Sequence, residues 1–161
     1  MELLYHPYAP EVPRKRLALE AIRDLFAYLP MSHRDPENAD VRQFLLLAGY
    51  MAGFPWLPKV NVGLSHSIGH AIGASYGIPH GMTSCMTLAP VIHLKAESSF
   101  EEAQQIARAI PIIGRKGSGN AVTDAHTLGD LVAELVASLG LKTSLTEVDH
   151  FHSCEKCTAE L

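Results

Sequence analysis

Three histidines stand close together between Gly63 and Pro90, in the segment GLSHSIGHAIGASYGIPHGMTSCMTLAP. His66, His70 and His80 fall within fifteen positions that contain no Asp, Glu, Lys or Arg. Imidazoles can bind a metal ion or carry a proton at neutral pH. Their placement in an apolar, glycine-rich segment indicates a site inside the protein rather than on a solvated face. The chemistry this favours is a metal ion bound within a helical core.

The spacing of the histidines can be tested against helix geometry. His66 and His70 are four residues apart, so on a helix they share one face with Cβ atoms about 6 Å apart. One helical face can thus offer two imidazoles to one ion or one substrate. The chain from Gly73 to His80 spans at most about 23 Å. The chain can therefore bring His80 back to His66 and His70 easily if the helix ends near Gly73, but only with strain if the helix continues to Gly77.

A plainer interpretation competes with the metal site. Each histidine could be a core residue that is hydrogen-bonded to a carbonyl, which is common for a single partly buried histidine. Three together in a charge-poor stretch weaken that interpretation. Spacing does not choose between zinc and iron, and this segment offers no carboxylate as a further ligand.

The elements that must position these histidines are all predicted to be helical. Apolar residues recur at helical spacing, no segment alternates as a strand does, and we expect Pro30 to end the first helix. Asn38 could cap the second helix, and Pro90 could kink the fourth. Residues 1–13 and 54–61 are expected to be irregular, and 114–120 to form a loop. The six expected helices cover residues 14–29, 39–53, about 62 to Gly73 or Gly77, 80–95, 99–110 and 123–139.

Composition narrows the function. The 161 residues are 47% hydrophobic, which suits one compact domain, and the net charge of −4 gives no basic surface for nucleic acid. No apolar run is long enough for a membrane span, and the N-terminus does not have the order of a secretory signal. Three cysteines fit a reducing compartment, so a cytoplasmic location is expected.

Other residues that could do chemistry are weaker candidates. The group H-x-H-x-C-x-x-C near the C-terminus could bind zinc, although a frayed tail is the favoured interpretation. Cys85 is expected to be a buried small residue rather than a nucleophile. Acid/base roles are disfavoured for groups at helix starts, where acidic residues favour the helix dipole. We expect three isolated histidines at surface or boundary positions and two tyrosines in packing roles. The possible zinc ligands are His150, His152, Cys154 and Cys157, and the disfavoured acid/base groups are Asp124, His126, Glu101 and Glu102. The isolated histidines are His6, His33 and His93, and the two tyrosines are Tyr5 and Tyr8.

The histidine segment closely resembles the signature of the iron-containing alcohol dehydrogenase family. That signature has a His, a second His four residues on, a Gly shortly after and then Pro-His-Gly. The form PHGMTSC leans toward the maleylacetate reductase-like branch. The stretches LALEAIRDLFAYLP, FLLLAGYMAG and LVAELVASLGLKTSLTEV also look like helices of this family. The resemblance covers about residues 1–148 and leaves 149–161 as a divergent tail.

The resemblance implies an all-α bundle like the C-terminal, dehydroquinate synthase-like domain of these enzymes. His66 and His80 would bind a divalent metal, Fe2+ or Zn2+, and His70 would relay a proton. Family enzymes hold NAD(P) mainly in an N-terminal α/β domain, for which this chain has no Gly-rich phosphate loop after a strand. Two further metal ligands would also precede Met1, since the pattern A-V-E-x-L-Y that follows one of them resembles MELLY.

The expected function is therefore that of a partial chain. The enzyme would reduce a carbonyl with NAD(P)H, or oxidise the alcohol, and its partner would be that small molecule. The isolated chain is expected to be inactive. The alternative is a non-catalytic helical module or an inactive truncated product. We also expect an apolar surface where the nucleotide domain would dock, and formation of a homo-oligomer is left open.

Overall fold

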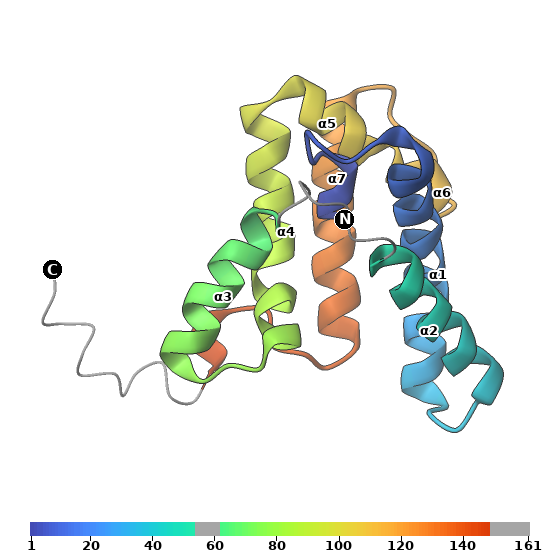
Figure 1. Ribbon diagram of the computed structural model, residues 1–161, viewed down its shortest axis with the longest axis vertical. Helices are drawn as coiled ribbons and strands as arrows, with labels where there is room; N and C mark the ends of the chain where they lie inside the picture. The colour runs from blue at the N-terminus through green and yellow to red at the C-terminus, as the bar shows by residue number, and fades with distance from the viewer. Residues whose placement is uncertain (54–61, 149–161) are drawn as a thin grey trace, which may run out of the picture.

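The structure, a computed structural model, describes residues 1–53 and 62–148 of the chain. All regular structure in these residues is helical, as the sequence predicts. Most of the helices contact α7, whereas α2 and α3 pack on its neighbours α1 and α4 (Figure 1). The elements are the short helices η1 (Glu2–Leu4), η2 (Glu11–Lys15) and η3 (Leu145–Glu147), and α1 (Arg16–Arg34), α2 (Ala39–Gly53), α3 (Leu64–Tyr76), α4 (His80–Ser98), α5 (Phe100–Ala107), α6 (Ala109–Ile112) and α7 (Ala121–Ser138).

Helix α7 lies at the centre of the bundle. Its residues Ala125, Leu128, Gly129 and Val132 are buried, at the i, i+3, i+4, i+7 spacing of one helical face. This face packs against α4 and α5, with further contacts to α6 and α1. Each neighbour brings fully buried aliphatic side chains, which are Ile22, Ile92, Ile106 and Ile110. The core is therefore one continuous apolar cluster between α7 and the surrounding helices.

Several helix ends follow the predicted signals. The side chain of Asn38 accepts a hydrogen bond from the Val41 N–H at 3.1 Å, so it caps α2 as expected. Ser99 caps α5 by accepting from the Glu102 N–H. Helix α3 ends at Gly77, one of its two predicted ends, where φ is +65°. A glycine adopts this left-handed conformation without the steric cost of a Cβ atom.

Two helix predictions are wrong, both because of proline. Helix α1 does not end at Pro30 but continues to Arg34. Its last turns pack on α2, where the rings of Tyr28 and Phe44 stack with centroids 4.6 Å apart, and this packing outweighs one lost hydrogen bond. The helix predicted over 99–110 is divided into α5 and α6. Pro111 has no N–H to donate to the Ala107 carbonyl, and residues 1–53 and 62–148 therefore contain seven α-helices where about six were expected.

The N-terminal segment is more ordered than predicted. It was expected to be irregular, but η1 and η2 lie within it and its side chains enter the core. Leu4 is 1% exposed, and Tyr5 and Ala9 are also buried. Burial of Leu4 and Tyr5 fixes this segment against the bundle, and it thereby brings Glu2 to the start of α3.

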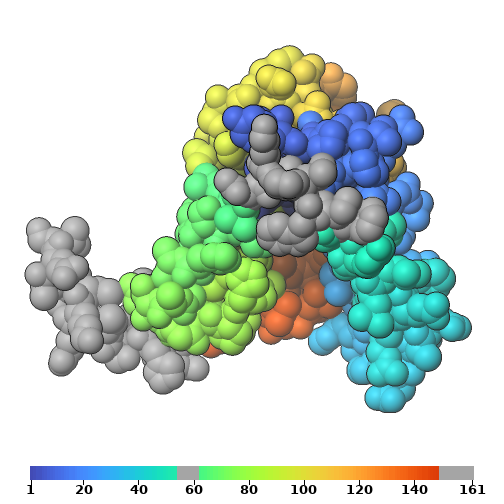
Figure 2. All heavy atoms as spheres, in the orientation of Figure 1, coloured from blue at the N-terminus to red at the C-terminus, as the bar shows by residue number. Residues whose placement is uncertain are grey.

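Two pairs of helices border a hollow in the molecule. Helix α3 packs against α4, and α2 packs against α1, and neither has another extensive neighbour among the described residues. Figure 2 shows the hollow between the α3–α4 side and α2, with α7 at its floor. The histidines of the predicted site lie on α3 and at the first residue of α4.

Candidate functional site

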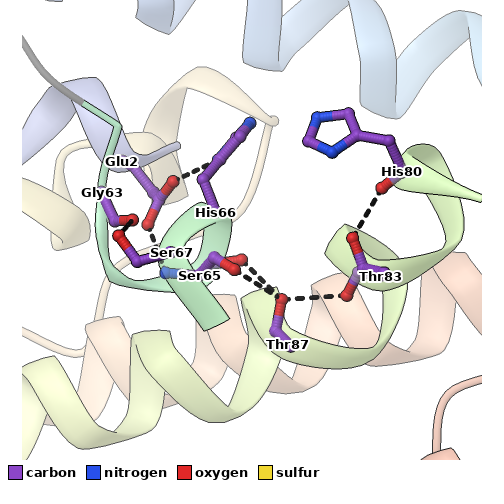
Figure 3. A network of polar contacts seen from close by, with 8 residues as sticks. All are labelled: Glu2, Gly63, Ser65, His66, Ser67, His80, Thr83 and Thr87. Carbon is purple, nitrogen blue, oxygen red and sulfur yellow. Dashed lines mark hydrogen bonds and ion pairs between the residues drawn. The ribbon is translucent and has the colours of Figure 1, made fainter. Parts of the chain in front are cut away.

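The three predicted histidines converge. The ring centroid of His80 lies 5.5 Å from that of His66 and 5.1 Å from that of His70, and the rings of His66 and His70 are 6.4 Å apart. Figure 3 shows the rings of His66 and His80 projecting from the same side of the α3–α4 pair. The fold thus gathers three imidazoles from two helices into one cluster, which we call the histidine cluster.

The strained return of His80 that was predicted for a long helix does not occur. Helix α3 runs to Tyr76, and His80 still reaches His66. The reason is the close approach of α3 and α4 at glycine. A Cβ atom at Gly69 would lie 2.7 Å from Thr83 Oγ1, and one at Gly73 would lie 3.3 Å from Thr83 Cγ2. Because the helix axes lie so close, the chain needs only a short reversal after α3.

The cluster is not buried in a helical core, and this part of the prediction is wrong. His70 and His80 are exposed, and the His66 side chain is 41% exposed. Helix α3 has only α4 as an extensive neighbour in the described residues, so its histidine-bearing face stays open. An open site can accept a ligand or a further protein surface without rearrangement of the core.

Glu2 holds His66 in place, and sequence reasoning missed it. Its carboxylate is buried, with Oε1 accepting from the Ser65 N–H at 2.7 Å and Oε2 lying 2.5 Å from His66 Nδ1. A Cβ atom at Gly63 would collide with this carboxylate, so a glycine is required there. No spacing in the sequence connects residue 2 to residue 66. The only signal was the glutamate in the family-like pattern that resembles MELLY.

The contact with Glu2 also orients the imidazole of His66. An ionised carboxylate only accepts hydrogen bonds, so the bond requires a proton on Nδ1 of His66. In the neutral ring this leaves Nε2 as a free acceptor or metal donor. A carboxylate behind a histidine is the usual outer partner of a metal-binding imidazole. Glu2 thus prepares His66 to act through Nε2.

A seam of hydroxyl groups links the positions of His66 and His80 (Figure 3). Thr87 Oγ1 lies 2.8 Å from Ser65 Oγ and within hydrogen-bond distance of the carbonyls of Ser65 and Thr83. Thr83 in turn donates to the carbonyl of His80 at 2.7 Å. Thr83 and Ser65 are at most 1% exposed. Their hydroxyls are satisfied within the seam, and the bonds from Thr87 to Ser65 fix the second turn of α4 against the first turn of α3.

A family model decides the relationship of this chain. The model for the C-terminal part of the Fe-containing alcohol dehydrogenase family matches residues 2–158. The chain belongs to the Fe-containing alcohol dehydrogenase family. A search of curated proteins found no match to it. The helical fold described above is consistent with the helical C-terminal domain of this family, as predicted.

For a member of the Fe-containing alcohol dehydrogenase family, the donor atoms of the cluster suit a divalent ion. Imidazole nitrogen binds both iron and zinc, and Nε2 of His66 is left available by Glu2. In residues 1–53 and 62–148, however, no group of three or more His, Cys, Asp or Glu side chains is placed so that it could hold a metal ion. The cluster therefore fits a metal only as part of a coordination shell that other ligands complete.

A second histidine pair lies away from the cluster. Nδ1 of His93 on α4 lies 2.7 Å from Nδ1 of His126 on α7, so one ring donates to the other. Asp130 and Glu97 lie 3.3 and 3.8 Å from the outer nitrogens of the two rings. His93 was expected to be an isolated histidine, and that prediction is wrong. The two residues are 33 positions apart, and only the packing of α4 on α7 brings them together.

The other candidates behave as structural residues. Glu102 lies in the first turn of α5 and Asp124 in the first turn of α7, where acidic residues favour the helix dipole, as expected. Cys85 is partly buried and donates to the Gly81 carbonyl, and burial raises the pKa of its thiol above the ordinary value. Tyr5 packs in the core, as expected, whereas Tyr8 is exposed. The predicted zinc group His150, His152, Cys154 and Cys157 lies outside the described residues.

None of the helices in the described residues has both the length and the apolar character that a membrane span requires.

Proposed function

We propose that this chain contributes the helical half of an active site that interconverts an alcohol and a carbonyl compound. The observation that carries the proposal is the convergence of His66, His70 and His80 in a chain of this family, with rings 5.1 to 6.4 Å apart. NADH or NADPH would supply the hydride, bound mainly by a nucleotide-binding domain outside this chain. A small alcohol or carbonyl compound would be the substrate.

Each histidine has a role in this proposal. His66 and His80 would bind Fe2+ or Zn2+, and Glu2 would keep His66 in the tautomer that presents Nε2. When bound, a divalent ion polarises a carbonyl oxygen and stabilises the charge of an alkoxide. His70 would transfer a proton to or from the substrate oxygen, which general acid catalysis requires when the hydride reaches carbon. The open face of α3 leaves room for substrate beside these rings.

The finer assignment to the maleylacetate reductase-like branch rests on the form of residues 79–85, PHGMTSC. It is part of the proposal rather than of the family relationship. In that branch a protein ligand of the metal can be Asn, so metal dependence itself has to be measured.

The experiment fuses this chain to the nucleotide-binding domain of a family member and measures oxidation of NADH and NADPH with a panel of ketones and aldehydes. We expect reduction of at least one carbonyl compound, and loss of activity and of bound metal in His66→Ala and His80→Ala. His70→Ala should keep the metal and lower kcat by about 100-fold or more, since general acid catalysis contributes that much. His33→Ala, an exposed residue on α1, is the control and should match the parent.

The isolated 161 residues should show no turnover, because the nicotinamide has no domain to hold it. A robust rate from the isolated chain would contradict this part of the proposal. If the fusion binds nucleotide but no histidine substitution changes metal content or rate, the chain is a non-catalytic helical module, which is the alternative.

A further inference from the structure

A cavity of about 400 Å³ opens beside the histidine cluster. It lies between the N-terminal segment, α1, the end of α2 and the first turns of α3 and α4, and His66 is part of its wall. Most of the remaining wall is apolar, formed by Ala18, Ala21, Ile22, Leu25 and Leu88. A cavity of this size and composition is suited to a small organic molecule.

Arg14 lies in the wall of this cavity and is 4% exposed. Its Nε atom is covered and has no hydrogen-bond partner among the residues that the structure describes. Among residues 1–53 and 62–148 its guanidinium forms no ion pair and no hydrogen bond. The intervening residues 54–61, FPWLPKVN, contain no Asp or Glu. Within the described residues, a buried positive charge thus faces this cavity without a counterion.

Glu2, the acidic residue in the cavity wall, does not neutralise Arg14. One of its oxygens accepts from the Ser65 N–H and the other contacts His66, and neither lies within ion-pair distance of Arg14. Two arginines at the surface do have carboxylate partners. Arg23 pairs with two carboxylates, and Arg108 pairs with Glu11. Burial of an unpaired guanidinium is unfavourable, and an anion in the cavity would supply the counterion that Arg14 lacks.

We propose that Arg14 binds the carboxylate of a small organic anion in this cavity. The guanidinium has a planar set of donors that matches a carboxylate, and the apolar wall suits a short aliphatic body. His66 lines the same cavity, so a hydroxyl or carbonyl group elsewhere on the anion can face the histidine cluster. That the anion is the substrate rests on the proposed function, whereas its binding does not.

The first test observes the arginine directly in the full chain. The Nε–Hε resonance of Arg14 is followed by NMR in 15N-labelled protein and assigned by its loss in Arg14→Lys. Succinate and acetate should shift it saturably, and the neutral diamide succinamide should not, at ionic strength held constant with KCl. Absence of a saturable shift with either carboxylate overturns the proposal. A stronger response to inorganic phosphate than to succinate overturns the choice of a carboxylate.

Matched variants separate binding from stability. Arg14→Met should weaken succinate binding by about 10- to 100-fold, the range for a lost hydrogen bond between charged groups. Arg23→Met, which removes an exposed arginine of α1, should bind like the parent chain. Because Arg14 has no partner to lose, Arg14→Met should unfold at an equal or higher temperature than the parent. Equal binding by Arg14→Met and the parent contradicts the proposal. If Arg14→Met fails to fold, the titration of the parent chain still decides.

The outcomes are distinct from those of the proposed function. These titrations need no nicotinamide, metal or second domain. No succinate binding, together with carbonyl reduction by the fusion protein, removes the Arg14 site and leaves the enzyme. Succinate binding at Arg14 without any turnover of the fusion protein leaves an anion site and removes the dehydrogenase.

Discussion

At the scale of single residues, Glu2 has the largest structural effect on the candidate site. One buried carboxylate satisfies an N–H at the first turn of α3 and fixes the ring of His66. It therefore contributes to the fold and to the orientation of a proposed ligand at once. Its removal would leave the Ser65 N–H, a buried donor, without a partner.

We expect Glu2→Ala to lower the free energy of unfolding by about 2 kcal/mol, the cost of a buried donor left unpaired. Glu2→Gln should cost less, because the amide oxygen can still accept from Ser65. Urea denaturation of the isolated chain measures both values. Glu20→Ala serves as the control, since it removes a half-exposed acid of α1, and it should change stability by about 0.5 kcal/mol or less. Equal losses for Glu2→Ala and Glu20→Ala would contradict the structural role given to Glu2.

The residues of the site differ in how far the sequence could predict them. The convergence of the histidines was predicted from the four-residue spacing of His66 and His70 and from the reach of the chain to His80, although a helix that continued to Gly77 was expected to strain that return. Glu2 and Arg14 could not be predicted, because their positions depend on how the N-terminal segment folds against α1 and α3. The pairing of His93 with His126 was missed for the same reason, since it depends on the packing of two helices far apart in sequence.

At the scale of elements, the α3–α4 pair depends on a glycine contact. Gly69 has the Thr83 side chain directly over its Cα, and Thr83 is part of the hydroxyl seam. A larger residue would push α4 away and disturb the start of the helix that carries His80. The contact explains why a weak helix former is found in the middle of α3.

We therefore expect opposite effects from two glycine-to-alanine substitutions. Gly69→Ala should destabilise the chain by about 1–3 kcal/mol, because the new methyl group overlaps Thr83. Gly49→Ala, in the middle of α2, meets no atom within 4 Å and should stabilise the chain by about 0.5–1 kcal/mol through helix propensity alone. Thermal denaturation followed by circular dichroism measures both changes. A stabilised Gly69→Ala variant would show that α3 and α4 are not in close contact.

Element prediction succeeded where local signals decide and failed where packing does. The cap at Asn38 and the helix end at Gly77 follow from the chemistry of single residues. Pro30 is a local signal too, but the contact of α1 with α2 overrides it. The openness of the histidine cluster was also missed, because the number of neighbours of α3 is a property of the whole bundle.

At the scale of the whole molecule, α2 presents an unusually apolar surface. Phe44, Leu46, Leu47 and Tyr50 are each 43–75% exposed. Helix α2 is apolar over much of its circumference, but only α1 covers it extensively in the described residues. Exposed apolar surface of this kind favours association, either with another domain or with a second copy.

We propose that this surface of α2 promotes self-association of the isolated chain. Leu46→Glu, which introduces a charge at its most exposed leucine, should shift the protein toward monomer in sedimentation velocity at high concentration. Leu94→Glu is the matched control, because Leu94 is also half-exposed but lies on α4. A parent chain that stays monomeric at high concentration would contradict the proposal, as would equal shifts from both variants.

The single attachment of α2 has a kinetic consequence. Releasing this helix breaks one helix–helix interface and leaves α4, α5 and α7 packed together. The amide protons of α2 should therefore exchange with solvent through partial opening, well before those of the central helices. Ala52 and Gly53 at the end of α2 form part of the cavity wall beside Arg14. The same fluctuation would widen the cavity, so the rate at which a ligand arrives or departs would depend on how often α2 detaches from α1.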